Sequence, residues 1–248
     1  MNEVMQTMMA HRSVRRYQEK ALPEGLLEEL VACGQQASTS SNMQAYTVIH
    51  VADPGIKTEL AGLCGDQAQI HQSAAFLAFC ADLNRLRVAG DMQKAERFDG
   101  DWGEGLLIAT VDAALVMQNV AVAAESVGLG ICMIGAIRNH PAKVGELLGL
   151  PPNAYAVSGL CLGYPDESPS VKPRLPQEAV LHTDRYLDET AHRELLTRYD
   201  GAMAAFYASQ DMHPDDPRWT TVASGRAGQF HKREGVDEYL KQQGFRLR

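Results

Sequence analysis

Residues 11–16 place three arginines and one serine within six positions of a chain whose net charge is −8. A local cluster of positive charge in an acidic chain is typical of an anion site, because the guanidinium fork matches phosphate and serine adds a short donor. A second basic pair, Lys172 and Arg174, lies in a proline-rich loop. If folding joins the two clusters, they would bind one phosphate from both sides. The alternative is a solvated arginine face on a surface helix.

Other motifs give no acid, base or nucleophile for catalysis. Gly128-Leu129-Gly130 follows an apolar helical stretch and has Met133 where a dinucleotide fingerprint needs a small residue, so it predicts a helix end followed by a strand. The histidines lack the spacing of a metal site, and no serine lies in a G-x-S-x-G turn. Anion-binding residues without such a constellation favour a protein whose cofactor performs the chemistry, with no metal.

Composition indicates an ordinary globular protein of one large domain or two small ones, with 248 residues, 45% hydrophobic and 22% charged. The acidic balance argues against nucleic acid or an anionic membrane as partner. Five scattered cysteines without a C-x-x-C pair, and a first segment unlike a signal peptide, predict a cytoplasmic location. Asp112 interrupts the longest apolar stretch, so we expect no membrane span.

Hydrophobic periodicity predicts helices over residues 3–10, 23–36, 104–127, 189–209 and 236–243, and strands over 46–51, 75–81, 131–136 and 157–165. Helices and strands do not alternate strictly, which favours an α+β fold. The stretch 104–127 is apolar around much of its circumference. We therefore expect a central helix that is buried on several sides and packed in a subunit interface.

Five stretches of the chain together resemble one known family. They read His11-Arg12-Ser13-Val14-Arg15-Arg16-Tyr17, Ser38-Thr39-Ser40-Ser41-Asn42-Met43-Gln44, Gly65-Asp66-Gln67, Gly128-Leu129-Gly130 with Ile134-Gly135, and Gly159-Leu160-Cys161-Leu162-Gly163-Tyr164-Pro165 with Lys172-Pro173-Arg174-Leu175-Pro176. On these residues the sequence is similar to the FMN-dependent nitroreductase family over essentially the whole chain. It most resembles the group of oxygen-insensitive NADPH nitroreductases and NADPH-flavin oxidoreductases.

The resemblance implies an α+β fold with a mixed sheet flanked by helices, in an intertwined homodimer that binds FMN in two sites across the subunit interface. It implies an FMN-binding core over residues 1–188. A C-terminal helical extension over residues 189–248 would pack on the core and on the partner subunit.

The resemblance also implies the residues of the flavin site. Those carried over as FMN-binding are His11, Arg12, Ser13, Arg15, Ser38, Ser40, Ser41, Gln44, Gln67, Ile134, Gly135, Ala136, Lys172 and Arg174. The serines and Gln44 would come in part from the other subunit. Arg15 would act in catalysis, because hydride addition at flavin N5 develops negative charge at N1 and the C2 carbonyl, which a cation stabilises. Gln44 and Gln67 have an alternative role as caps of neighbouring turns.

The implied activity is an FMN-dependent NAD(P)H oxidoreductase that passes two electrons by ping-pong hydride transfer to nitroaromatics, quinones or other small oxidants. Two alternatives stay open: a flavin reductase that supplies reduced FMN, and a flavin-binding redox sensor without efficient turnover. The redox sensor stays open because the sequence departs from the family in its loop at residues 210–218, where relatives carry arginines and this chain carries three aspartates. We expect NADPH as donor, with NADH as an alternative. The candidate residues for its phosphate are Arg218, Arg226 and Arg233. Ala136 is a second departure, since it replaces a glycine.

Overall fold

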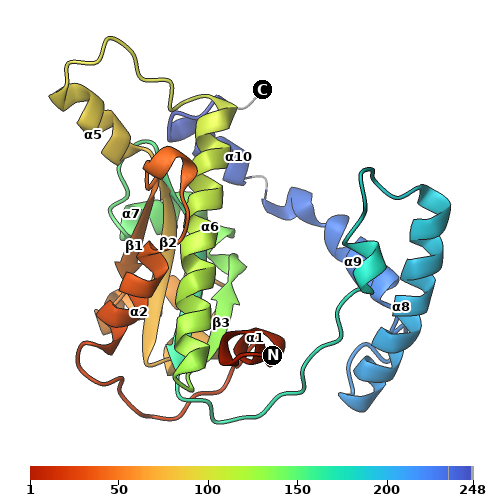
Figure 1. The fold of residues 1–248 in the computed structure, drawn as a ribbon. Helices are drawn as coiled ribbons and strands as arrows, with labels where there is room; N and C mark the ends of the chain where they lie inside the picture. Colours follow the sequence, from red (N-terminus) through yellow and green to blue (C-terminus); the bar gives the residue numbers. More distant parts are fainter. Residues whose placement is uncertain (234, 247–248) are drawn as a thin grey trace. The chain divides into compact units, whose positions relative to one another are not determined.

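Four antiparallel strands form the sheet around which the chain folds (Figure 1). Their order across the sheet is β1-β2-β4-β3, with β1 at Tyr46–His50, β2 at Ala75–Asp82, β4 at Ala154–Gly163 and β3 at Gly130–Ile134. Every residue of the two central strands is buried, as expected for apolar runs with neighbours on both sides. A single parallel bridge between Ser13 and Ile131 adds the N-terminal segment beside β3. The predicted mixed sheet thus consists of antiparallel strands and this one parallel contact.

The computed structural model describes residues 1–233 and 235–246. These form two compact units, one of residues 1–169 with 233–246 and the other of residues 170–232. The second unit contains η3 (Gln177–Ala179), α8 (Glu189–Ser209) and α9 (Trp219–Ala227), and η4 (Phe230–Arg233) ends at the border. Tyr199, Met203 and Tyr207 of α8 form its small core. The division between residues 188 and 189 stays a prediction.

Helices cover both faces of the sheet in the first unit. Its helical elements are α1 (Glu3–Met9), α2 (Leu26–Gln35), η1 (Ser40–Asn42), α3 (Pro54–Leu63), α4 (Ala68–Gln72), α5 (Asn84–Met92), α6 (Gly103–Ser126), η2 (Gly135–Arg138), α7 (Pro141–Leu147) and α10 (Gly235–Gln242). Successive side chains of a strand face opposite ways. Leu77 and Phe79 of β2 accordingly pack with α6, whereas Phe76 and Ala78 pack with residues of α3, α4 and α7.

Helix α6 is the main support of one sheet face (Figure 1). Among the described residues it is the one helix long and apolar enough to cross a membrane by length and composition, although the sequence predicted none. Its inward residues, Val116 and Val120 among them, are fully buried in the core, which accounts for its apolar character. Leu107, Val111 and Leu115 are instead exposed at four-residue spacing and form one apolar stripe.

The predicted helix end at Gly128 is confirmed. Gly128 has a φ of +81°, the left-handed conformation that glycine adopts without strain, and the Leu129 N–H donates to the carbonyl of Ala124. Gly130 then begins β3 against the side chain of Val14. A Cβ on Gly130 would lie 2.8 Å from the Val14 Cβ, so only glycine admits this contact without a shift. The N-terminal segment therefore lies directly on β3.

Candidate functional site

Residues 13–18 form an extended ribbon between β3 and the chain that follows β4. The Val14 N–H donates to the Ile131 carbonyl at 2.8 Å, and the Gln18 N–H donates to the Tyr164 carbonyl at 2.9 Å. Val14 and Tyr17 are buried, whereas Arg15 is exposed. Because the buried residues fix the backbone, the basic side chains project from a rigid support. The arginine segment is thus not a surface helix, which excludes that alternative.

Glu167 binds the backbone of this ribbon. Its Oε1 accepts the N–H of Arg15 at 2.6 Å and that of Arg16 at 3.2 Å, and its Oε2 accepts the Arg16 Nε at 3.2 Å. Burial raises the pKa of Glu167, but these hydrogen bonds outweigh it, so the pKa lies below its usual value. No ion pair to the Arg15 guanidinium occurs among the described residues. Glu167 therefore fixes the position of Arg15 without neutralising its side chain.

His11 is fixed by a carboxylate near the end of α6. Its Nδ1 lies 2.8 Å from the Glu125 Oε1, and the Glu125 side chain is 12% exposed. A carboxylate near a helix C-terminus faces the negative end of the helix dipole, so a hydrogen-bonding partner such as His11 compensates an otherwise unfavourable position. With Nδ1 engaged, the His11 ring presents its Nε2 to other groups.

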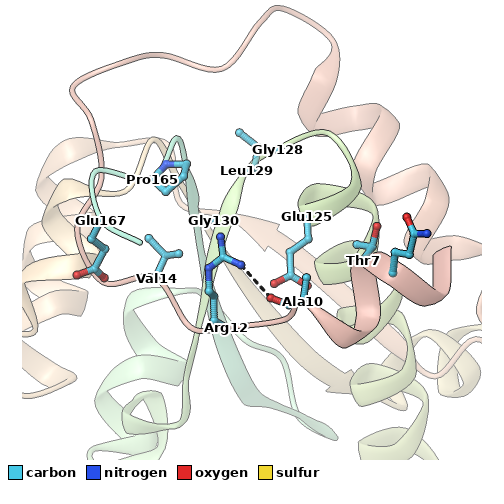
Figure 2. A pocket seen from close by; sticks show the side chains of 11 residues that line it. Thr7, Ala10, Arg12, Val14, Glu125, Gly128, Leu129, Gly130, Pro165 and Glu167 are labelled. Carbon is cyan, nitrogen blue, oxygen red and sulfur yellow. Dashed lines mark hydrogen bonds between the residues drawn. The ribbon is translucent and has the colours of Figure 1, made fainter. Parts of the chain in front are cut away.

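Arg12 lies in a hollow of about 370 Å³ next to this histidine. Figure 2 shows its guanidinium between Glu125 on one side and Val14, Pro165 and Glu167 on the other. Its Nη1 donates to the Ala10 carbonyl at 3.1 Å. The structure thus brings together four predicted site residues of the ribbon and the turn before it: His11, Arg12, Ser13 and Arg15.

The predicted serine loop packs against a different part of α6 from the part that binds His11. Ser38, Ser40, Ser41 and Gln44 are exposed, and the loop is held by hydrogen bonds to Asp112. Asp112 and Glu125, the α6 residues that hold the loop and His11, are 13 positions apart, about 20 Å along a helix. Within one chain, the structure does not bring the serine loop to the basic ribbon.

The remaining predicted residues of the first unit lie at the end of β3 and beside it. Ile134 is buried at the end of β3, and Gly135 and Ala136 begin η2 half-buried. Gln67 precedes α4, and its Nε2 donates to the Cys64 carbonyl at 2.8 Å. Gln44 likewise donates to the Asn42 carbonyl at 3.3 Å. Both glutamines thus make the local turn contacts that were the alternative to flavin binding.

Lys172 and Arg174 belong to the second unit. The Lys172 Nζ lies 5.7 Å from the centre of the Tyr207 ring, and the Tyr199 hydroxyl donates to the Pro173 carbonyl at 2.8 Å. The backbone between the two basic residues is therefore attached to α8. The joint phosphate site of the two basic clusters stays a prediction.

Arg218 is engaged by a neighbouring carboxylate. Its Nη2 lies 2.5 Å from the Asp216 Oδ2 and its Nε lies 2.8 Å from the Asp216 Oδ1. Hydrogen bonds from Arg218 and Thr221 hold the pKa of Asp216 well below its usual range. Arg226 lies exposed in the last turn of α9, and the Arg233 Nε donates to the Asn139 Oδ1 at 3.1 Å in the first unit. A 2′-phosphate would compete with Asp216 for Arg218.

Family models match almost the whole chain. The model described as "Nitroreductase family" covers residues 8–164, and that described as "Nitroreductase family, C-terminal domain" covers residues 172–248. The chain belongs to the nitroreductase family. The recognition made from the five sequence stretches is confirmed.

Relatives within the family extend over the full chain. The sequence is 36% identical over 250 residues to the NADPH-flavin oxidoreductase of Vibrio harveyi, with 100% of both chains covered. It is 36% identical over 251 residues to the oxygen-insensitive NADPH nitroreductase of Salmonella typhimurium, again with 100% of both covered. The solved structure of NfrA2 from B. megaterium superposes with a TM-score of 0.94 at 38% identity, covering 100% of both chains. The α+β nitroreductase fold is thus confirmed.

Three carboxylates that hold the site of this family member were not among the predicted residues: Asp112, Glu125 and Glu167. Two of them carried a signal in the sequence, because an acidic residue inside a strongly apolar helix requires a partner. Glu167 carried none, since it lies in a polar turn where acidic residues are common.

We predict that Glu167→Gln destabilises the protein at pH 7 and has little effect in acid. The charged carboxylate accepts three hydrogen bonds, so its loss lowers the free energy of unfolding by about 1–3 kcal/mol. Its pKa is lowered in the folded state from an ordinary 4.5, so this stabilisation is present above pH 4.5 and is lost as the pH falls through the lower folded value. Urea denaturation of both proteins between about pH 3 and pH 7 measures this difference in the free energy of unfolding.

Asp91→Asn is the matched control, because Asp91 pairs with Arg87 on the exposed surface of α5. A surface pair of this kind contributes about 0–1 kcal/mol. A Glu167→Gln effect that is independent of pH would show that the charge of Glu167 is not what binds the ribbon.

Proposed function

We propose that the chain is an FMN-dependent NAD(P)H oxidoreductase. The full-length similarity to an NADPH-flavin oxidoreductase and an NADPH nitroreductase carries this proposal, since both basic segments of the sequence lie within the matched length. Relatives from Bacillus subtilis that are named FMN reductase support the same cofactor. One solved relative with a TM-score of 0.89 is the Vibrio harveyi NADPH:FMN oxidoreductase in complex with NAD+, at 34% identity and with 100% of both chains covered.

The donor set of the ribbon fits FMN. A flavin mononucleotide offers one phosphate, a hydroxylated chain and a planar ring with carbonyl acceptors. The ribbon and the turn before it offer guanidinium, hydroxyl and imidazole donors. No carboxylate of the described residues forms an ion pair with Arg12 or Arg15. Their positive charges therefore remain to bind an anion.

When bound, FMN would supply the two-electron hydride chemistry between NAD(P)H and a small oxidant. Arg12 and Ser13, with Lys172 and Arg174, would bind its phosphate and ribityl chain. Arg15 would place positive charge beside the ring edge where negative charge develops. The acceptors proposed are nitroaromatics and quinones, with free FMN as a second candidate because relatives are named as FMN reductases.

The active form that we propose is a homodimer in the cytoplasm. About 20 Å of α6 separates the serine loop from the ribbon in one chain, so a site containing both requires a second copy. The exposed stripe of Leu107, Val111 and Leu115 on the same helix offers the apolar surface for it. Five free cysteines, four of them buried, are consistent with a reducing compartment.

We expect the wild type to have twice its chain mass of 27.1 kDa in solution and Val111→Arg to weaken this dimer. An arginine in the centre of an apolar interface buries an unpaired charge, which opposes association. Light scattering over a concentration series measures the mass. Val88→Arg is the control, because Val88 is a similarly exposed valine on α5. A wild-type monomer that binds flavin would contradict the proposal.

We predict that the protein binds FMN and that NADPH reduces it with a weaker preference over NADH than an intact phosphate site would give. Because Asp216 already binds Arg218, the loop offers the 2′-phosphate at most about one charge-assisted bond of roughly 1.5–3 kcal/mol, and repulsion by the aspartates offsets part of it. Anaerobic stopped-flow bleaching of the yellow flavin with each nucleotide measures the preference between NADPH and NADH. Nitrofurazone and free FMN, offered as competing acceptors, identify the class of electron acceptor.

Four outcomes are informative, two from this stopped-flow experiment, one from identifying the flavin released on denaturation and one from the Arg218→Ala variant. FAD on denaturation, or no flavin after reconstitution, would refute the cofactor. Bound flavin that neither nucleotide bleaches would favour a redox sensor over an enzyme. A preference for NADPH above about a thousandfold, or roughly 4 kcal/mol, would reveal a phosphate site elsewhere. Equal loss of both activities in Arg218→Ala would assign that residue to the fold.

Arg15→Ala is expected to weaken FMN binding and to slow flavin reduction together. The variant removes the guanidinium but keeps the N–H that Glu167 accepts, so the ribbon stays in place. Loss of a charge-assisted contact costs about 1.5–3 kcal/mol, or roughly ten- to a hundredfold. FMN titration and stopped-flow reduction measure the two effects, with the exposed Arg87→Ala on α5 as control. Wild-type values in Arg15→Ala would make Arg15 a surface charge only.

A further inference from the structure

Asp112 is a fully buried carboxylate in the middle of the apolar helix α6. Its residue is 1% exposed, and among the described residues it has no ion-pair partner. Transfer of a carboxylate from water into a protein core is strongly unfavourable unless hydrogen bonds compensate it. The hydrogen-bond partners of Asp112 must therefore compensate for its burial.

Both carboxylate oxygens of Asp112 bind one loop. The Oδ1 accepts the Ser40 N–H at 3.1 Å, and the Oδ2 accepts the Ala45 N–H at 3.1 Å. The two donors bracket the segment between them. Asp112 thus closes residues 40–45 into a loop of fixed width against α6.

The loop between these two bonds has an unfavourable backbone. Ser41, Asn42 and Gln44 have φ angles of 48°, 56° and 51°, in the left-handed region that residues other than glycine avoid. Their side chains are exposed, so no packing of their own holds this conformation. Hydrogen bonds within the loop support it, from the Gln44 N–H to the Thr39 hydroxyl and from the Gln44 Nε2 to the Asn42 carbonyl, and Asp112 adds a buried constraint from outside the loop.

Arg85 supplies a second constraint at the end of the loop. Its Nη1 donates to the Gln44 carbonyl at 3.0 Å and to the Tyr46 carbonyl at 2.8 Å. The Asp82 carboxylate in turn accepts the Arg85 N–H at 3.2 Å. The loop is therefore held at its N–H groups by a buried carboxyl group and at its carbonyls by a guanidinium, and its polar side chains are exposed.

We propose that Asp112 is a positioning residue for the cofactor. Buried under the loop, it cannot touch a ligand, and it acts by holding Ser40, Ser41 and Gln44 in the arrangement that binds FMN. The inference rests on the proposed function, since it takes the loop as part of the flavin site. It goes beyond that function by making the affinity of the loop for FMN depend on one carboxylate in α6, that of Asp112.

Asp112→Asn is the direct test, because it keeps the shape and replaces one acceptor oxygen by an amide that faces an N–H donor. We expect the FMN dissociation constant to rise at least tenfold, about 1.4 kcal/mol. The visible circular dichroism of FMN at saturation should also change, since the loop contacts differ. Thr110→Val is the control: it removes a hydroxyl of the same helix that bonds to Leu106 and Tyr155 and not to the loop. Its FMN affinity should stay within about twofold of the wild type.

Ser40→Pro against Ser40→Ala tests the same bond from the other side. Both variants lack the hydroxyl, and only proline lacks the N–H that Asp112 accepts. The site tolerates proline, because Ser40 begins η1 and the preceding Thr39 is extended, with φ −126° and ψ 154°. We expect Ser40→Pro to bind FMN several-fold more weakly than Ser40→Ala, and to add little when Asp112→Asn is present. This comparison decides the matter if Asp112→Asn does not fold.

Amide hydrogen exchange of residues 38–46 in the protein without FMN tests the positioning role of Asp112 separately from the proposed FMN-dependent function. Faster exchange in Asp112→Asn and not in Thr110→Val supports the hold of Asp112 on the loop, whatever the ligand. If the wild type binds no FMN, the proposed function fails and this exchange alone tests Asp112. If the wild type binds FMN and folded Asp112→Asn binds it equally well with an unchanged flavin spectrum, the positioning role is overturned.

Discussion

The site depends on carboxylates placed along one buried helix. Asp112 and Glu125 both project from α6, whose other inward side chains pack on the sheet, and each binds one of the predicted cofactor segments. A charge inside an apolar helix is stable only with its partner in place. The packing of α6 on the sheet and the positioning of each segment are therefore coupled, because each carboxylate is satisfied only when its own segment has docked.

The same helix explains why one chain does not bring the two predicted segments together. A rigid α-helix fixes the distance between its residues, and the positions of Asp112 and Glu125 keep the serine loop and the basic ribbon about 20 Å apart. The apolar stripe that includes Val111 lies on the same helix, next in sequence to Asp112. Association through this stripe would bring a second copy close to the residue that holds the loop. In the proposed dimer, assembly and cofactor binding would then be linked through adjacent positions of one element.

The sequence predicted the elements whose signal is local and long. The strand at 75–81 and the helix at 189–209 have continuous patterns and lie where predicted, with β2 extending to Asp82. Helix α3 was missed because Asp53-Pro54-Gly55 resembles the turn that closes a strand, whereas Asp53 caps a helix by accepting the Ile56 N–H. The carboxylates of the site were missed for another reason. The contact of Glu167 with Arg15 spans 152 residues, and nothing local predicts such a pair.

Carboxylates bind arginines in different ways in the N-terminal ribbon and in the loop at residues 210–218. Glu167 accepts the N–H of Arg15 and forms no ion pair with its guanidinium among the described residues, so that guanidinium keeps its donors for an anion. Asp216 instead binds the guanidinium of Arg218 itself, two residues away, and cancels most of its charge. The second contact was readable from the sequence because it is local, and the first was not. Whether a carboxylate binds the backbone of an arginine or its side chain therefore decides whether that guanidinium keeps its donors for another anion.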